Sequence, residues 1–455
     1  MKLPPAPPDL STLIAKMDLQ ALAHLLQSHS QLADNNYLHW DEILRRTSPD
    51  GLTAESWWVA LKLSRRSLYR RLPLLSKTGE PFVFAMPEPV IMHLHHIDQE
   101  AGGKILSTES KNLPSKSHQK RYLVNSLIEE AITSSQLEGA STTRKVAEAM
   151  LRQGRKPRDH SEQMIFNNYR AMEIIRSMQK DLITPERILE LHAILTEDTL
   201  EDTKDAGRLR HSDDIHVADN RDGTILHQPP THTELANRLK RLCDFANADE
   251  NTTPFVHPVV RAILLHFMIG YDHPFVDGNG RTARTLFYWS MARSGYWLME
   301  YVSISHFLRN APAKYVRAYL HTETDDNDTT YFVIHQLEII RRAIAQFHEF
   351  FSRVYKQQLE VERILASSPA LQGKLNHRQI ALLTHALKHP GETYTIQGHQ
   401  KVHGVAFQTS RTDLLSLADM NLVNKTLSGT RYLFTAPLNI HDRINDLVAS
   451  SQNVS

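Results

Sequence analysis

The chain has 455 residues, 41% of them hydrophobic, which is enough to bury the cores of two or three domains. Its 52 basic and 51 acidic residues leave a formal net charge of +1, so no overall field steers it toward nucleic acid or an anionic membrane. The single cysteine, Cys243, excludes an intramolecular disulfide framework and cysteine-based zinc clusters. With no apolar stretch of membrane-spanning length and no signal-peptide core, we expect a cytoplasmic protein without a membrane partner.

The first 117 residues are expected to form a mostly helical region after a proline-rich start. Apolar residues have helical spacing over 10–17, 19–26, 38–44 and 55–62. A basic cluster follows, which we interpret as a solvated face, with binding of phosphate or an acidic protein left open; it comprises Arg65, Arg66, Arg70 and Arg71.

The chain contains 26 histidines, so metal sites have to be considered. The densest group, His93, His95 and His96, has no acid or cysteine nearby at ligand spacing. We therefore expect histidines scattered over surface and core.

A helical pattern from about Gln119 to Leu137 ends in a short polar motif. Ser134 and Glu138 are four residues apart and so share one face of that helix. Gly139 stands where a C-cap glycine would fall. Taken alone, Glu138 is an ordinary exposed carboxylate at a helix end.

Helices are also expected over residues 146–151, 164–175 and 185–195. Thr184 and Pro185 form a helix-start pair, with threonine as the N-cap and proline in the first helical position.

Two short β-like runs, 214–218 and 224–230, flank an Asp/Asn/Gly turn and predict a hairpin. In a helical protein its outer edge should be unpaired, and such an edge can bind an extended peptide by strand addition. The alternative is that the hairpin only closes a loop between helices. Helical patterns resume over 233–246 and 256–271.

The most informative stretch runs from His273 to Arg284, between apolar segments. Its Asp-Gly-Asn-Gly centre predicts a tight turn joining two helices. If the second helix starts near Gly280, its free N–H groups and positive dipole end make an anion-binding site. The guanidinium groups of Arg281 and Arg284 would add positive charge and donors suited to a polyphosphate. Asp277 could hold a divalent cation, and His273 could accept a proton from an attacking hydroxyl.

This stretch resembles the signature of the Fic family, H-x-F-x-[DE]-G-N-G-R-x-x-R, and matches every specified position. The resemblance implies transfer of AMP from ATP to a tyrosine, threonine or serine hydroxyl of a target protein or of the protein itself. It implies that His273 takes the hydroxyl proton and that Asp277 holds Mg²⁺. The same resemblance implies phosphate binding by Gly278, Asn279, Gly280, Arg281 and Arg284.

The residues from Ser134 to Gly139 resemble the family's inhibitory helix motif, [ST]-x-x-x-E-[GN]. The resemblance implies that Glu138 pairs with Arg284, occupies donors meant for the γ-phosphate, and leaves ATP only a pose that is wrong for in-line attack. It also implies that the hairpin is a flap that positions the target segment beside the histidine, with docking residues Ile215, Val217, Ile225 and Leu226.

After the signature, helices are expected over 286–294 and 307–319, and one or two long helices over about 331–365. The acidic segment 322–328 lacks the glycine and terminal glutamate of a calcium loop, so we expect a solvated loop. Residues 375–440 predict three helices and two β-like runs in an order that resembles a winged helix. Residues 409–412 at the start of its third helix could touch DNA, but such modules also dock proteins or form dimers, and both readings stay open.

We therefore predict a mainly α protein with a Fic helical core and β-hairpin flap, a helical N-terminal region and a C-terminal winged-helix domain. The expected parts are 1–117, an inhibitory helix over 118–140, a Fic core over 141–320, linking helices over 321–374, the winged-helix-like module over 375–440 and a tail over 441–455. The predicted function is that of an autoinhibited protein adenylyltransferase, with ATP as substrate, Mg²⁺ as cofactor, and a homodimer as a further expectation. Two alternatives remain: removal of AMP by a hydrolase that uses Glu138, and a DNA-binding regulator whose core senses nucleotide.

Overall fold

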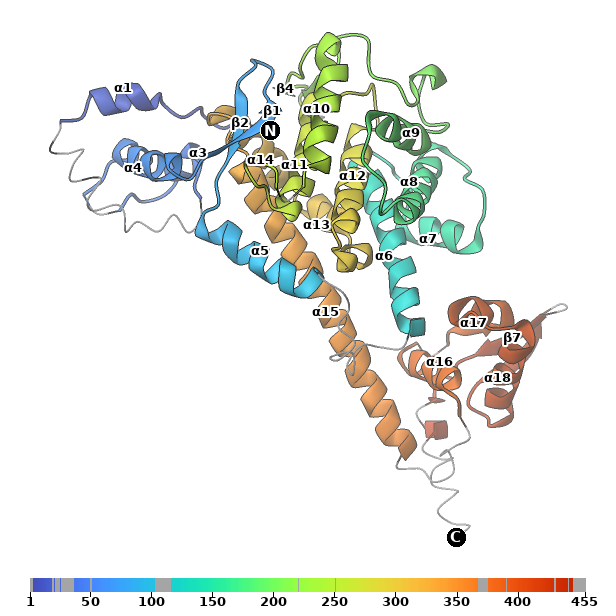
Figure 1. Cartoon of the computed structure of the whole chain (residues 1–455). Coiled ribbons are helices and arrows are strands. Elements are labelled where there is room, and N and C mark those ends of the chain that lie inside the picture. Colours follow the sequence, from blue (N-terminus) through green and yellow to red (C-terminus); the bar gives the residue numbers. More distant parts are fainter. Residues whose placement is uncertain are drawn as a thin grey trace. The chain divides into compact units, whose positions relative to one another are not determined.

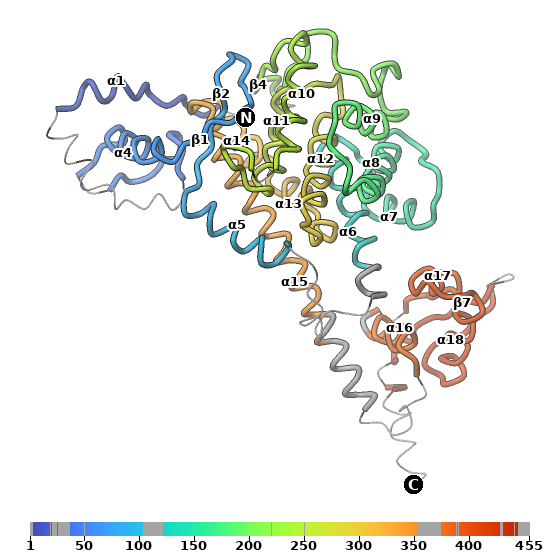
Figure 2. The backbone as a smooth tube through the Cα atoms, viewed as in Figure 1, coloured from blue at the N-terminus to red at the C-terminus, as the bar shows by residue number. Residues whose placement is uncertain are grey.

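A computed structural model describes residues 3–18, 20, 25, 37–49, 51–102, 116–219, 221–249, 251–366, 375–389, 391–428, 431–440 and 442–444 (Figures 1 and 2). Most of the helix expected over 19–26 lies outside these residues. Helices dominate the described chain, and its strands form only two two-stranded sheets and one three-stranded sheet. The prediction of a mainly α fold is confirmed. None of the helices in the described part has the length and apolar composition that crossing a bilayer requires.

The chain divides into two compact units, residues 1–105 with 124–345, and residues 106–123 with 346–455. Two helices continue from one unit into the other, α6 (Lys116–Leu137) and α15 (Thr330–Ala366). The remaining helices of the first unit are α1 (Leu10–Ala15), α3 (Trp40–Ile43), α4 (Ala54–Arg66), α5 (Glu88–Ala101), α7 (Arg144–Gln153), α8 (His160–Ser177), α9 (Pro185–Leu195), α10 (Leu235–Asn247), α11 (Pro258–Asp272), α12 (Asn279–Arg293), α13 (Ile304–Asn310) and α14 (Pro312–Thr324).

The N-terminal region is mostly helical, as predicted, and it also contains a hairpin that was not predicted. Strands β1 (Arg70–Leu75) and β2 (Pro81–Phe84) form an antiparallel hairpin, which α5 follows. In the basic cluster, Arg66, Arg70 and Arg71 are exposed, whereas Arg65 does not belong to the expected solvated face. Arg65 is buried and donates to the hydroxyl of Tyr331 at 2.8 Å and to the carbonyl of Leu38 at 2.9 Å, whereas the last two arginines of that cluster begin β1.

The acidic segment 322–328 is not a solvated loop, and this prediction was wrong. The carboxylate of Asp325 is buried, lies 2.7 Å from Nζ of Lys62 and accepts from the Tyr331 hydroxyl at 2.7 Å. Asp328 is also buried and accepts from the hydroxyl of Tyr37 at 2.6 Å. A buried carboxylate needs such partners to offset its lost hydration, and here Lys62 and Tyr37 supply them from more than 260 positions away in the sequence.

Helices α11 and α12 form the centre of the first unit. Buried residues occur on every side of both helices, as expected for helices enclosed by others. Helix α10 packs on α11, and α8 and α9 pack on α12 (Figure 1). The loop between α11 and α12 is therefore fixed at both ends by helices that are buried in the core of the unit.

The second unit contains the elements predicted for a winged helix, in the predicted order. They are α16 (His377–Lys388), β5 (Thr393–Thr395), α17 (Ile396–His403), α18 (Phe407–Asp419), β6 (Asn424–Ser428) and β7 (Arg431–Thr435). The strands form an antiparallel sheet in the order β5-β7-β6 over a core that includes Leu383, Leu414 and Phe434. Ser410 at the start of α18 is fully buried, so among residues 409–412, which could touch DNA, this serine does not present its hydroxyl to a partner.

Candidate functional site

The signature residues form a short loop between α11 and α12, as predicted. His273 follows the last residue of α11 with a φ of +45°, and Gly278 precedes α12 with a φ of +81°, a conformation that suits glycine. The side-chain amide of Asn279 closes the loop, because its Oδ1 accepts from the N–H of Phe275 at 2.9 Å and its Nδ2 donates to the carbonyl of Phe275 at 2.8 Å.

This bonding changes the role expected for Asn279. We had expected its amide group to contact phosphate, but both ends of the amide are engaged with Phe275. The backbone N–H groups at the start of α12 have no carbonyl partner within the helix and carry its positive dipole end. The anion site therefore rests on this helix start, with Asn279 holding the loop in shape.

His273 has the geometry of a proton acceptor. Its Nδ1 lies 3.2 Å from the carbonyl oxygen of Gly270, which assigns the ring proton to Nδ1 and leaves the Nε2 lone pair for another group. Burial lowers the pKa of His273, and only the hydrogen bond to Gly270 and the charge of Glu138 act in the opposite direction among the leading contributions. The imidazole is therefore neutral at pH 7.

The two arginines of the signature make different contacts. Arg281 is fully buried, donating from Nη1 to the carbonyl of Leu195 at 2.8 Å and from Nη2 to Oδ2 of Asp277 at 3.1 Å. Arg284 donates to Oγ of Ser134 at 2.8 Å and to its carbonyl at 2.9 Å. The guanidinium of Arg284 is thus turned toward α6.

The predicted contact between Glu138 and Arg284 is present. Oε1 of Glu138 lies 2.8 Å from Nη2 of Arg284. The same carboxylate packs against the start of α12, where a Cβ atom on Gly280 would lie 2.6 Å from its Cδ. The side chain of Glu138 thus occupies the position at the helix N-terminus where we expected a phosphate group.

Another glutamate, Glu130 within α6, anchors this helix and was not predicted. It is buried and accepts hydrogen bonds from the hydroxyl of Tyr288 on α12 at 2.9 Å and from Oγ of Ser303 at 2.8 Å. It also accepts from the N–H of Ser305 at 3.1 Å and from the hydroxyl of that serine. These donors come from α12 and the start of α13, so α6 is fixed to the helix that carries Arg284.

The predicted hairpin is present, with very short strands. They are β3 (Val217–Ala218) and β4 (Ile225–His227), paired antiparallel with an irregularity between Val217 and Ala218. In the described chain this sheet has two strands, so each retains an edge without a strand partner. Val217, Ile225 and Leu226 lie in the strands, whereas Ile215 precedes them. The side chain of Ile225 is the most exposed of these four at 52%.

Two residues that were not predicted attach the hairpin and the residues before it to the signature loop and to the end of α11. Arg210, which is buried, donates from Nε to the carbonyl of His273 at 3.0 Å, and its own N–H donates to the carbonyl of Pro274 at 2.9 Å. His227, at the end of β4, lies 2.7 Å from the carbonyl oxygen of Tyr271 through Nε2 and 2.7 Å from Glu323 through Nδ1. Their only sequence signal is a polar residue beside a turn.

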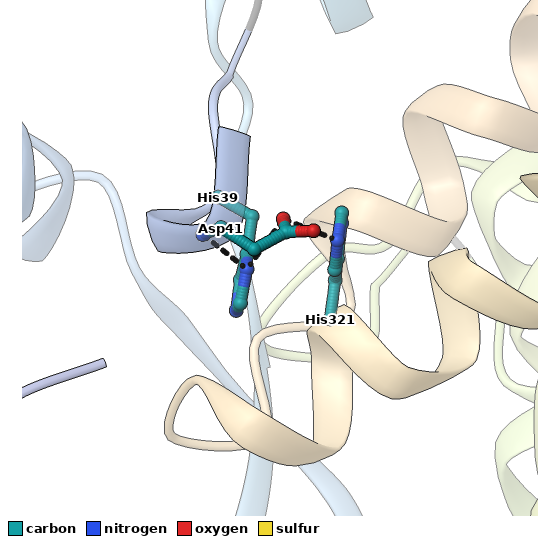
Figure 3. Close-up of side chains that lie close together, drawn as sticks. All are labelled: His39, Asp41 and His321. Carbon is teal, nitrogen blue, oxygen red and sulfur yellow. Dashed lines mark hydrogen bonds and ion pairs between the residues drawn. The ribbon is translucent and has the colours of Figure 1, made fainter. Parts of the chain in front are cut away.

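One group of metal-ligand type lies in the described part of the chain, formed by His39, Asp41 and His321 (Figure 3). Oδ1 of Asp41 is 3.1 Å from Nδ1 of His39 and 2.9 Å from Nε2 of His321, and Oδ2 is 3.2 Å from each of two arginines. The two rings stack with centroids 4.1 Å apart and planes 8° from parallel. Since a metal bonds imidazole nitrogen in the ring plane at about 2.0 Å, no point serves both rings, and the arrangement is that of a hydrogen-bonded carboxylate.

Two buried histidines predict a loss of stability in acid. Burial lowers the pKa of His192 to about 4 and that of His335 to about 4. Because an unfolded histidine has a pKa of about 6.5, the stabilisation is complete above that pH and falls as the pH approaches 4, by about 2 kcal/mol for each residue at pH 5. Chemical unfolding at several pH values checks this.

The substitution His335→Gln removes one titrating histidine and leaves the others in place. The unfolding free energy of this variant should fall less steeply between pH 6.5 and 5 than that of the wild type, by about 1 kcal/mol per pH unit on average. Equal slopes in the two proteins would contradict the prediction. Above pH 7 both curves should run parallel.

The loop between α11 and α12 thus brings a buried imidazole next to a helix N-terminus and two arginines. Residues 182–291 match the Fic/DOC family. Curated relatives include protein adenylyltransferase Fic of Drosophila willistoni, 33% identical over 160 residues that cover 34% of this chain and 29% of the relative. The protein of the same name from Drosophila melanogaster is 34% identical over 160 residues, with 34% and 29% covered. A crystal structure of a Fic family protein from Desulfovibrio desulfuricans G20 aligns with a TM-score of 0.49 at 19% identity, covering 77% of this chain and 96% of that chain.

The chain therefore carries a Fic/DOC domain over residues 182–291, and the resemblance of its signature is confirmed. The match spans less than a third of the length of these curated relatives.

Proposed function

We propose that this protein is an autoinhibited adenylyltransferase, which moves AMP from ATP to a tyrosine, threonine or serine hydroxyl of a protein. The observation that carries the proposal is the loop between α11 and α12, where a neutral imidazole adjoins a helix start with unpaired N–H groups. The names of the curated relatives support the same reaction.

In this reaction His273 takes the proton of the target hydroxyl on Nε2 as the hydroxyl oxygen bonds to the α-phosphorus. The bond from the α-phosphorus to the oxygen that bridges to the β-phosphate breaks, and pyrophosphate leaves with that bonding pair. The start of α12, with Gly280 and Arg281, neutralises charge on the β- and γ-phosphates, and Arg284 joins it once Glu138 has turned away.

Asp277 fits the Mg²⁺ that accompanies ATP. Its side chain is 54% exposed at the rim of the loop, and Oδ2 pairs with Arg281, which leaves Oδ1 to bind a cation. Mg²⁺ is commonly held by one or two carboxylates together with substrate phosphates, where it offsets their negative charge. The role of Asp277 is to place a carboxylate next to the phosphates.

The hairpin is the proposed binding site for a segment of the target protein. An extended segment that pairs with the outer edge of β3 or β4 would be held beside the signature loop, because Arg210 ties this part of the chain to the carbonyls of His273 and Pro274. The exposed Ile225 would add apolar contact.

The test is incubation of the wild type and Glu138→Gly with a cell lysate, Mg²⁺ and ATP labelled at the α-phosphate. A parallel reaction carries the label at the γ-phosphate. Protein bands labelled from the α-phosphate alone, stronger with the variant, are expected. If neither protein gives an α-labelled band, AMP transfer is excluded under these conditions, and an AMP-modified protein becomes the substrate to offer.

A further inference from the structure

His192 lies under the signature loop. It belongs to α9, is 1% exposed, and its ring stacks on that of Phe275 with centroids 3.7 Å apart and planes 5° from parallel. Phe275 is itself fully buried in the middle of the loop. Between the two rings there is no room for water, so the imidazole position follows that of the loop.

Both ring nitrogens of His192 make hydrogen bonds to backbone groups. Nδ1 accepts from the N–H of Gly207 at 3.0 Å, so the proton must reside on Nε2. Nε2 lies 2.9 Å from the carbonyl oxygen of Asp277 and donates to it. Only the neutral tautomer with Nε2–H satisfies both contacts.

The end of α9 forms the floor of the loop around this histidine. A Cβ atom on Gly278 would lie 2.7 Å from Cγ2 of Thr196 and 3.3 Å from Nε2 of His192, so the loop backbone approaches α9 as closely as glycine allows. One residue earlier on α9, the carbonyl of Leu195 accepts from Arg281. The backbone at Asp277 and Gly278 is thus in contact with the end of α9.

We propose that His192 is a positioning residue that holds Asp277 for the Mg²⁺–ATP complex. Through its hydrogen bond with Gly207 it also ties the chain that precedes the hairpin to the loop at Asp277. This rests on the proposed function. His192 touches neither ATP nor the target in the proposed reaction. Its hydrogen bond to the Asp277 carbonyl fixes the backbone from which the carboxylate projects, and a metal ligand loses affinity when its supporting contact is removed.

Three substitutions separate the contacts of His192. Phenylalanine keeps the stack on Phe275 and loses both hydrogen bonds. Glutamine places an N–H donor near the position of Nε2 and can still reach the Asp277 carbonyl, whereas asparagine retains an acceptor near Nδ1 and loses that donor. Each substitution is made in the Glu138→Gly protein, so that the phosphate site is open in all of them.

The measurement is the Mg²⁺ concentration that half-saturates binding of ATP, followed by calorimetry, with binding of ATP in EDTA as the baseline. We expect His192→Phe and His192→Asn to raise this concentration about tenfold and His192→Gln to change it less than threefold. ATP binding in EDTA should be equal in all variants. Thermal unfolding establishes that each variant is folded.

Two results would overturn the proposal. One is an unchanged Mg²⁺ requirement in both His192→Phe and His192→Asn, and the asparagine variant decides the matter where the phenylalanine variant does not fold. The other is an equal rise of the half-saturating Mg²⁺ concentration in all three variants, because the effect would then come from loss of the imidazole as such and not from loss of the hydrogen bond to Asp277. Binding is measured without any transfer, so failure of the proposed AMP transfer would be seen separately with α-labelled ATP.

Discussion

Replacing Glu138 by glycine should increase the rate of AMP transfer by roughly tenfold or more. The carboxylate of Glu138 is 2.8 Å from Arg284 and packs against Gly280, so a phosphate group cannot take this place while the side chain is there. Removing the Glu138 side chain frees Nη2 of Arg284 to donate to a phosphate group and leaves the N-terminal end of α12 open. The rate of incorporation of α-labelled AMP into protein, at fixed ATP and Mg²⁺, measures the effect.

A control is needed, because glycine at position 138 also loosens the end of α6. Gln136→Gly loosens the same turn but keeps the carboxylate. This variant should transfer AMP at the wild-type rate or close to it. If Gln136→Gly is as active as Glu138→Gly, the effect belongs to the helix end and not to the ion pair with Arg284.

Removing the imidazole of His273 should lower AMP transfer by roughly 100-fold or more, because general bases contribute at least that factor. Asparagine is the sharper substitution. His273 has a φ of +45°, which asparagine tolerates better than alanine, and the asparagine amide can still donate to the carbonyl of Gly270. Transfer by His273→Asn and His273→Ala, each combined with Glu138→Gly, is compared with that of Glu138→Gly alone.

The pH dependence gives this prediction a second readout. Since burial lowers the pKa of His273, the acid limb of the rate profile should lie below pH 6.5, the ordinary value for histidine. Above pH 6.5 the rate of transfer should not change through protonation of His273. Both His273 variants should still bind ATP, since the start of α12 is unaltered. If His273→Asn combined with Glu138→Gly transferred AMP as fast as Glu138→Gly alone, His273 would not be the general base.

The loop between α11 and α12 could be predicted because its determinants are local. Glycine and asparagine set the turn, apolar runs set the flanking helices, and Thr184 and Pro185 mark the start of α9 where the structure has it. The contact of Glu138 with Arg284 was predicted only through resemblance to a family motif. No spacing rule connects residues 146 positions apart.

What could not be predicted are contacts that only tertiary packing brings together. His192 and Arg210 hold the signature loop, and Glu130 holds α6. In the sequence His192 and Glu130 are polar residues in an apolar pattern, and Arg210 lies in a polar segment, so none of them stands out. The misjudged acidic segment has the same cause, since the partner of Asp325 is Lys62 on α4. Asn279 was misassigned for a different reason: its short side chain reaches the loop backbone before it reaches solvent.

The anchoring of α6 by Glu130 has a consequence for how ATP and the inhibitory side chain compete. Because Glu130 is fixed to α12 and α13, Glu138 cannot leave by detachment of the helix, and only its own side chain or the turn at Gly139 has to move. The competitor therefore belongs to the same molecule, at an effective concentration on the order of millimolar or higher. Dilution of the protein would leave the inhibition unchanged, and the ATP level at which transfer begins would be a property of the single chain.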